Sequence, residues 1–247
     1  MTQIDAARAG ICTPEMKAVA AKEYKTPEEI RDAVAKGSIA IPANINHTTL
    51  DPEGVGEGLR TKVNVNLGIS GDLMDEEMEL EKARIALELG AEGIMDLSNH
   101  GKTREFRRKL LAMSSAMIGT VPMYDAIGYL EKPLIGITAQ DFLDVIRAHA
   151  EDGVDFVTVH AGMNRRVIES FKETGRLMNI VSRGGSSFLL GWKRRETKIL
   201  SMSTMMKCSK YFTNTMSLSA SVMQCDQDAP TMQAMRGRLL NLSKLAS

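Results

Sequence analysis

From Lys62 to Trp192, short apolar runs alternate with segments of helical spacing, and five of these runs end in polar or reactive side chains. The five ends have the sequences NVN, IMDLS, VPMY, TVHAG and VSRGG. Intervals of about 20 to 40 residues between strands, with helices between them, predict right-handed βαβ units and a parallel sheet. In a (β/α) barrel, catalytic and binding groups lie at the C-terminal ends of successive strands. The alternation therefore predicts an α/β fold whose site residues converge on one edge of the sheet.

The first strand shows the clearest pattern. In KVNVNLG, Val63, Val65 and Leu67 fall on one face, with Asn64 and Asn66 on the other. We therefore expect both amides to point the same way.

Helices and further strands are predicted beyond it. The segment 75–89 carries Met78, Ile85 and Leu89 at helical spacing and ends at Gly90. The sequence also predicts a basic helix over 103–113 and another helix over 138–152. MIGTVPMY, FVTVHAG and MNIVSRGG are predicted as strands.

Two helix starts precede the alternation. Thr13 and Thr26 each place a capping hydroxyl before a Pro-Glu pair, and Glu29 completes a capping box with Thr26. Gly37 is predicted to end the second helix. IAIPANINH is expected to be extended, and residues 51–60, with three glycines, to form a loop.

These elements divide the chain into three parts. Residues 1–60 are predicted as an N-terminal helical extension and residues 61–192 as the first five βα units of a barrel. A closed barrel needs eight strands, so the expected fold is α/β with a partial (β/α)8 TIM-type barrel. Residues 193–247 show no strand and helix alternation and are predicted to be an aberrant, poorly ordered tail.

Several side chains at the predicted strand ends could carry chemistry. Asn64 and Asn66 could hold a hydroxyl or phosphate group through their amides, or could instead cap a helix. His160 could act as an acid, a base or a phosphate contact, or could be structural. Tyr124 could present its phenol to a ligand, or could be a buried tyrosine with one partner.

The strongest isolated signal is Ser182, Arg183 and the two glycines that follow, which offer backbone donors and a guanidinium for an anion; a flexible turn is the alternative. By residue type alone, Met95 is expected in the core. Asp96 and Asp125 suggest paired carboxylates, but their separation in sequence does not place them together. These features predict a barrel enzyme that acts on a phosphorylated small molecule.

Seven segments taken together closely resemble the phosphomethylpyrimidine synthase family. They have the sequences GICTPEM, IPANINH, KVNVNLG, IMDLS, GTVPMYDA, DGVDFVTVHAG and IVSRGGSSFLLGW, and the resemblance covers residues 1–192 in order. The resemblance implies the pyrimidine step of thiamine biosynthesis, in which aminoimidazole ribonucleotide is rearranged to hydroxymethylpyrimidine phosphate. It also implies radical chemistry with S-adenosylmethionine and a [4Fe-4S] cluster, a carbon-carbon lyase class, a zinc ion and a homodimer.

The matching motifs carry the family's substrate contacts onto seven positions of this chain, and no catalytic residue or metal ligand is assigned. The seven positions are Asn66, Met95, Tyr124, His160, Ser182, Arg183 and Gly184. The family's DGxRPG loop, zinc histidines and Cys-rich cluster motif are not found in this sequence. Cys12, Cys208 and Cys225 have no paired spacing. We therefore expect this chain to be inactive alone.

The composition of the tail suggests a shifted reading frame. Residues 193–247 hold seven of the 17 methionines and eight serines, but one glycine and one valine. Read one base out of frame, codons for residues 194–206 can encode ETGNENPLYEYYD, and those for 219–229 can encode SLGDAMRPGC. The second string is close to the missing loop. The sequence therefore predicts a one-base frameshift near Trp192.

Charge and hydropathy exclude other classes of protein. The net charge is zero, and residues 193–247 carry nine Lys or Arg against three acidic residues, without the compact basic cluster typical of nucleic-acid binding. The first ten residues lack the features of a signal peptide, and no apolar run reaches the roughly 18 residues of a membrane span. A cytoplasmic protein with a small-molecule substrate, and no nucleic-acid or membrane partner, is expected.

Two alternatives remain open. One is a metal-independent barrel lyase or isomerase that uses His160 as the base and Arg183 for phosphate. The other is a non-catalytic fragment that pairs with a partner chain supplying the missing strands.

Overall fold

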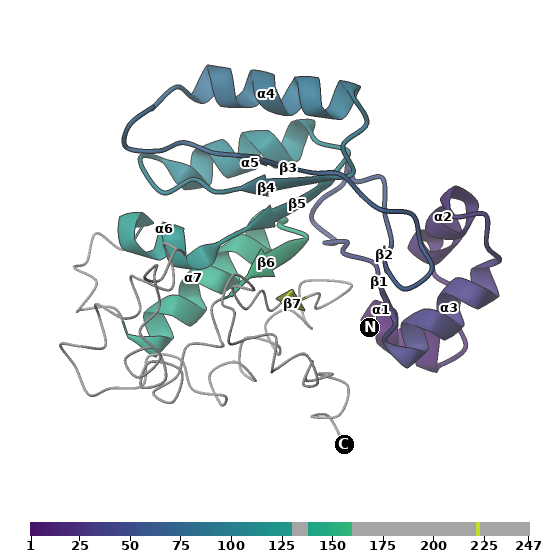
Figure 1. Cartoon of the computed structure of the whole chain (residues 1–247). Helices are drawn as coiled ribbons and strands as arrows, with labels where there is room; N and C mark the ends of the chain where they lie inside the picture. The colour runs from purple at the N-terminus through teal and green to yellow at the C-terminus, as the bar shows by residue number, and fades with distance from the viewer. Residues whose placement is uncertain (130–137, 160–220, 223–247) are drawn as a thin grey trace, which may run out of the picture.

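The computed structural model describes residues 1–129, 138–159 and 221–222 (Figure 1). The N-terminal elements are α1 (Gln3–Arg8), α2 (Pro14–Lys22), α3 (Pro27–Lys36), β1 (Ile39–Ala40) and β2 (Val55–Gly56). The elements that follow are β3 (Asn64–Leu67), α4 (Glu76–Glu88), β4 (Gly93–Asp96), α5 (Thr103–Met113), β5 (Met117–Thr120), α6 (Pro122–Tyr129), α7 (Ala139–Asp152), β6 (Phe156–Thr158) and β7 (Ser221–Val222).

The first helices begin and end where their local sequence predicts. The Thr13 side chain caps α2, and the Thr26 and Glu29 side chains form the expected capping box of α3. Gly37 ends α3 in the left-handed conformation, with φ of 78°. A similar capping box, formed by Thr2 and Asp5, begins the short helix α1, which the sequence reasoning did not predict.

The three helices enclose a small core beside the sheet, which includes Met16, Val19, Ile30 and Ile41. Residues 51–60, expected as a loop, contain the two-residue strand β2, which pairs antiparallel with β1. A Cβ at Gly56 would lie 2.2 Å from the Ser38 carbonyl oxygen, so only glycine permits this close approach.

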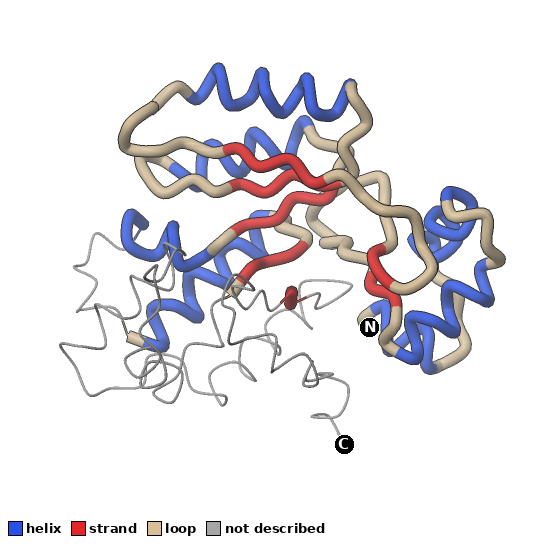
Figure 2. Tube along the Cα trace, in the orientation of Figure 1, coloured by secondary structure: helices blue, strands red, loops and turns tan. Residues whose placement is uncertain are grey.

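The larger sheet is parallel, as the alternation predicted, and its strands lie in the order β3-β4-β5-β6-β7 (Figure 2). The strand β7 was not predicted, because it comes from the segment 193–247. Its core lies between the sheet and helices α4, α5 and α7. On the sheet side it contains Ile94, Ile118 and Val157, and on the helix side Phe106 and Phe142. No described helix is long and apolar enough to cross a membrane.

Helix α4 differs from the expectation in which face it buries. Met78, Ile85 and Leu89 are exposed, whereas Ala83 and Ala86 are buried against the core. The buried stripe lies about 100° around the helix axis from the apolar one, because each residue advances the helix by that angle. Ala83 lies in the core, and Leu80 and Leu87, on the same side of the helix, are partly buried against it.

The far side of the parallel sheet is described only in part. The strand expected at MNIVSRGG lies outside the described residues, and β7, from the segment 193–247, pairs in parallel with β6. The described residues therefore form an α/β fold with a parallel sheet, and closure into a barrel is a proposal. The predicted boundaries at residues 60 and 192 also stay predictions.

Residues 39–47, expected to be extended, contain β1, and the part after it is hydrogen-bonded to the end of α7 and the start of β6. The Asn44 side-chain amide donates to the carbonyl oxygens of Ala150 and Val154, each at 2.8 Å. The N–H of Asn44 donates to the Asp155 carboxylate at 2.9 Å. These bonds join the N-terminal extension to the sheet.

Candidate functional site

Asn66 and Met95 lie next to each other on the face of the sheet opposite the helices. They are register partners on β3 and β4, and Met95 is in turn paired with Gly119 on β5. Because side chains alternate along a strand, this row faces away from the core that contains Leu67 and Ile94. The structure therefore brings two of the predicted contacts together at one edge of the sheet.

The two asparagines of β3 point the same way, as predicted. The Asn64 side-chain amide donates to the Asn66 side-chain oxygen at 3.0 Å, and both residues are exposed. Because Asn66 accepts through its oxygen, both of its own amide hydrogens can donate to an external acceptor. The one hydrogen bond of the Asn66 side chain among the described residues is the one it accepts from Asn64.

Gly119 makes room for the side chains on either side of it. A Cβ at this position would lie 2.8 Å from the Met95 sulfur and 2.2 Å from the Phe156 ring. Met95 and Phe156 thus fill the space above Gly119, and Met95 is half-buried rather than enclosed in the core. The expectation from residue type alone, that Met95 is a core residue, is only partly met.

Tyr124 lies on a helix rather than at a strand end, which corrects the expectation that MIGTVPMY is a single strand. Strand β5 ends at Thr120, and α6 begins at Pro122. Proline lacks an N–H and suits the first position of a helix, so the chain turns into α6 at once. Tyr124 falls in the first turn of α6, half-buried against the main core.

The other four predicted contacts, His160, Ser182, Arg183 and Gly184, lie outside the described residues. Their roles, and those of Asn66, Met95 and Tyr124, stay predictions.

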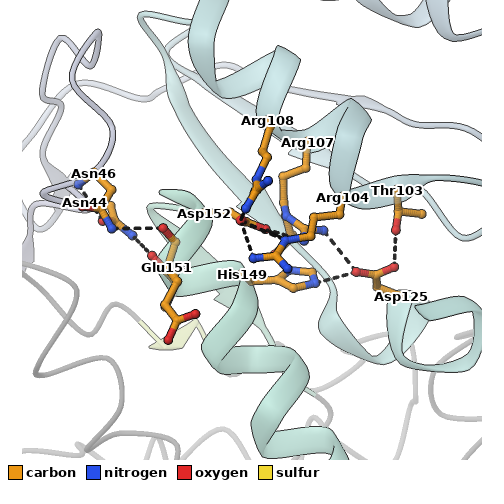
Figure 3. A network of polar contacts seen from close by, with 12 residues as sticks. Asn44, Asn46, Thr103, Arg104, Arg107, Arg108, Asp125, His149, Glu151 and Asp152 are labelled. Carbon is orange, nitrogen blue, oxygen red and sulfur yellow. Dashed lines mark hydrogen bonds and ion pairs between the residues drawn. The ribbon is translucent and has the colours of Figure 1, made fainter. Parts of the chain in front are cut away.

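A buried polar network joins α5, α6 and α7 (Figure 3). The Arg107 side chain, 1% exposed, donates to Asp125 at 3.1 Å and to Asp152 at 2.8 Å. Asp152 also accepts from Arg104 and Arg108. The basic helix predicted over 103–113 therefore carries its charge partly inward.

Asp125 is the centre of this network. Its carboxylate accepts a hydrogen bond from the Thr103 hydroxyl and one from His149 Nε2 at 2.8 Å. Burial on its own would raise the pKa of Asp125, but the bonds from His149 and Thr103 and the charge of Arg107 lower it to about 2. Asp125 is therefore ionised at neutral pH.

His149 completes a carboxylate, imidazole and hydroxyl series. Because ionised Asp125 can only accept, Nε2 carries the proton, and Nδ1 accepts from the Thr120 hydroxyl at 2.8 Å. Burial lowers the pKa of His149, so the ring is neutral. The order is that of a nucleophilic triad, but Thr120 is 2% exposed. Without access to a substrate, the series serves to hold the elements together.

The structure brings Asp96 and Asp125 close enough to interact, which the sequence could suggest but not establish. The charge of Asp125 contributes to raising the pKa of Asp96, although burial is the larger cause. Sequence reasoning missed Arg107. Its position between Phe106 and Leu110, on the apolar face of α5, was the available signal.

The described residues do not present a ligand set for a cluster or a metal ion. Cys12 is the one cysteine among them, and no group of three or more His, Cys, Asp or Glu side chains in this part of the chain could hold a metal.

Comparison with known proteins identifies the family. A profile described as the radical SAM ThiC family matches residues 2–235. The chain belongs to the radical SAM ThiC family. Similar relatives of this family include phosphomethylpyrimidine synthases of Alkaliphilus oremlandii, 58% identical, and of Alkaliphilus metalliredigens, 60% identical. A third, from Clostridioides difficile, is 59% identical.

Each of these three alignments with ThiC-family relatives spans 197 residues, which is 80% of this chain and 45% of the relative. The chain thus spans about half the length of the curated relatives that it matches. The resemblance found in the seven sequence segments is confirmed at the level of the family.

Proposed function

We propose that this chain forms the first part of the substrate site of a phosphomethylpyrimidine synthase. The relatives bear that name, and the reaction expected of them rearranges aminoimidazole ribonucleotide to hydroxymethylpyrimidine phosphate. The observation that carries the proposal is the pairing of Asn66 with Met95 on the open face of two neighbouring parallel strands. In parallel α/β folds, ligands bind outside the carboxyl ends of the strands.

The proposed contacts have complementary chemistry. Asn66 can donate and accept through its amide, and Met95 offers a polarisable apolar surface to a heterocyclic ring. Tyr124, in the first turn of α6, contributes a phenol. His160, Ser182, Arg183 and Gly184 would supply the phosphate end with an imidazole, a hydroxyl, a guanidinium and a backbone donor.

The family also motivates several finer proposals. They are a (β/α)8 barrel, carbon-carbon lyase chemistry with S-adenosylmethionine and a [4Fe-4S] cluster, a zinc ion, a homodimer and a cytoplasmic location. We expect the present chain to lack turnover alone, because its sequence does not contain the family's Cys-rich motif.

Ligand binding tests the proposed substrate site without requiring turnover. Isothermal titration calorimetry of the purified chain with aminoimidazole ribonucleotide should show saturable binding. Asn66→Ala should weaken it roughly tenfold, the effect of one lost hydrogen bond of about 1.4 kcal/mol. Asn46→Ala is the matched control, because Asn46 is an exposed asparagine that donates to the Glu151 carbonyl near the end of α7. Equal losses in the two variants, or no binding by the wild type, would contradict the proposal.

We also propose that residues 193–247 are translated out of frame, although the family profile extends to residue 235. The support is the alternative reading of residues 194–206 and 219–229 and the methionine-rich composition. The nucleotide sequence across codons 185–247 should contain a single inserted or deleted base near codon 192 relative to its homologues. A frame that aligns without such a change would exclude a frameshift.

A further inference from the structure

Two loops follow β3 and β4 directly after the proposed contacts Asn66 and Met95, and they are bonded to each other. The N–H of Leu97 donates to the Leu67 carbonyl at 2.8 Å, and the N–H of Asn99 donates to the Ile69 carbonyl at 3.0 Å. The loops therefore continue side by side beyond the last register pair of the two strands, Leu67 with Asp96.

A side chain replaces one backbone acceptor in this extension. In a regular parallel ladder, the Ile69 N–H would donate to the carbonyl of residue 97. The hydroxyl oxygen of Ser98 accepts it instead, at 3.0 Å. Ser98 is 6% exposed, so loss of this acceptor would leave a buried N–H without a partner.

Asp96 holds Ser98 in place from the helix side of the sheet. Its carboxylate accepts the Ser98 N–H at 2.9 Å, and a hydrogen bond from the Ser98 side chain lowers its pKa. Ser98 thus donates its N–H to Asp96 and accepts from the Ile69 N–H through its hydroxyl oxygen. Asp96 is 5% exposed, so the bond to the Ser98 backbone is made away from water.

Two further features tighten the same junction. Gly68 approaches the neighbouring loop so closely that a Cβ would lie 2.5 Å from the Ser98 nitrogen. Its N–H donates to Glu79 of α4 at 2.8 Å, and Glu79 is 3% exposed. Buried carboxylates from β4 and α4 therefore hold the two loops in register.

We propose that Asp96 is a positioning residue which, through Ser98, fixes the loops after β3 and β4 and with them the edge that carries Asn66 and Met95. The effect on a ligand rests on the proposed function; the effect on the loops does not. Asp96 does not touch that edge from the ligand side, because it points to the face covered by helices.

The contact of Asp96 with Ser98, together with the Ser98 contact to Ile69, is called the brace below. The charge state of Asp96 makes the brace sensitive to pH. Burial raises the pKa of Asp96 to about 6, against the hydrogen bonds from Ser98 and the charge of Arg107, and Asp125 adds to the rise. These are the charged groups that face it from α5 and α6. The bonds from Ser98 lower the pKa of Asp96, so they are stronger to the ionised carboxylate than to the protonated group. When the loop opens and Asp96 stays buried, only these bonds are lost, so protonation below this pH weakens the closed loop.

Amide hydrogen exchange tests the brace independently of any ligand. Asp96→Asn and Ser98→Ala should each lower the protection factors of the Ile69 and Asn99 amides roughly tenfold, the loss expected for one hydrogen bond to a charged group. Asp155→Asn is the matched control, because Asp155 is a buried carboxylate that accepts backbone N–H groups at the opposite end of the sheet. It should leave the protection of both loops unchanged.

Hydrogen exchange of the wild type measured across a pH range tests the same proposal, and its result does not depend on whether a variant folds well. The wild-type protection factors at Ile69 and Asn99, corrected for intrinsic exchange, should fall as the pH is lowered through 6, and those of Asp96→Asn should not. Unchanged loops in both variants, a flat wild-type profile, or equal loosening in Asp155→Asn would each overturn the proposal.

Ligand affinity separates this proposal from the proposed function. If wild type binds aminoimidazole ribonucleotide, both brace variants should bind it about tenfold more weakly, in line with their lower protection. Loosened loops with unchanged affinity would overturn the role of Asp96 at the site. If the two variants have loosened loops but the wild type binds no ribonucleotide, the role of Asp96 in holding the loops is supported and the proposed function is contradicted.

Discussion

His47 Nδ1 lies 2.7 Å from the Asp155 carboxylate, a buried pair formed across 108 residues of sequence. The other ring nitrogen, Nε2, lies 3.0 Å from the Ser114 carbonyl oxygen. Both neighbours are acceptors, so the geometry favours an imidazolium that donates from both nitrogens. The pair joins the N-terminal segment 41–51 to the start of β5 and β6.

We expect this pair to make stability depend on pH. Burial alone lowers the pKa of His47, but the hydrogen bond to Asp155, its charge and the Ser114 carbonyl together raise it above the usual 6.5. The folded state then holds the proton more tightly than the unfolded chain does. The stabilisation is complete below about 6.5 and is lost as pH rises through the folded pKa.

Urea unfolding between pH 6.5 and 9 should therefore show a free energy of unfolding that declines with pH, and His47→Gln should remove that decline. In this range His149, whose pKa is lowered by burial, stays neutral, and Asp96, with a pKa of about 6, becomes fully ionised. A wild type and variant with parallel pH profiles would show that His47 is neutral in the folded protein.

Arg107→Met should destabilise the protein by about 3 to 5 kcal/mol, because it leaves Asp125 and Asp152 buried with fewer compensating donors. Arg84→Met is the matched control. Arg84 also pairs with two carboxylates, those of Glu81 and Glu88, but on the exposed face of α4. Its loss should cost under about 1 kcal/mol in the same chemical denaturation experiment. Similar costs for the two arginines would contradict the buried network.

Gly119→Ala should destabilise the sheet by about 1 to 3 kcal/mol, because the new methyl group would meet the Phe156 ring and the Met95 sulfur. It should also weaken ribonucleotide binding by displacing Met95. Gly71→Ala is the control, since its Cβ would lie 3.7 Å from His100, an ordinary contact. Thermal unfolding and calorimetric titration of both variants would measure the two effects. A stable Gly119→Ala protein with wild-type affinity would show that Met95 and Phe156 can move aside for a methyl group.

The assignment of the buried face of α4 can be tested with two substitutions on one helix. Ile85→Lys should change the free energy of unfolding by less than about 0.5 kcal/mol, because Ile85 is 43% exposed. Ala83→Leu should cost about 1 to 3 kcal/mol, because Ala83 is fully buried against the sheet. If thermal denaturation showed a larger cost for Ile85→Lys than for Ala83→Leu, the helix would bury the face that carries Met78 and Ile85, and the assignment would be wrong.

Local signals predicted the elements well because their causes are local. The Thr26 and Glu29 capping box, the glycine that ends α3 and the alternation of Asn64 with Val65 each depend on neighbours within a few residues. The order of strands and helices also followed from the sequence, since a parallel sheet requires a crossover between strands. Pro122 was a local signal as well, because proline suits the first position of a helix. It marks the start of α6, which contains Tyr124.

The sequence by itself determined the parallel α/β order, the helix starts and the shared face of Asn64 and Asn66. The tertiary structure alone decided that Arg107 is buried, because its partners Asp125 and Asp152 come from 18 and 45 residues away. It alone decided that Asp96 lies close enough to Arg107 and Asp125 to interact with both charges, and that α4 turns Met78 and Ile85 outward and buries Ala83. Burial and charge pairing depend on which segments meet in space, and that information is not contained in the periodicity of any one segment.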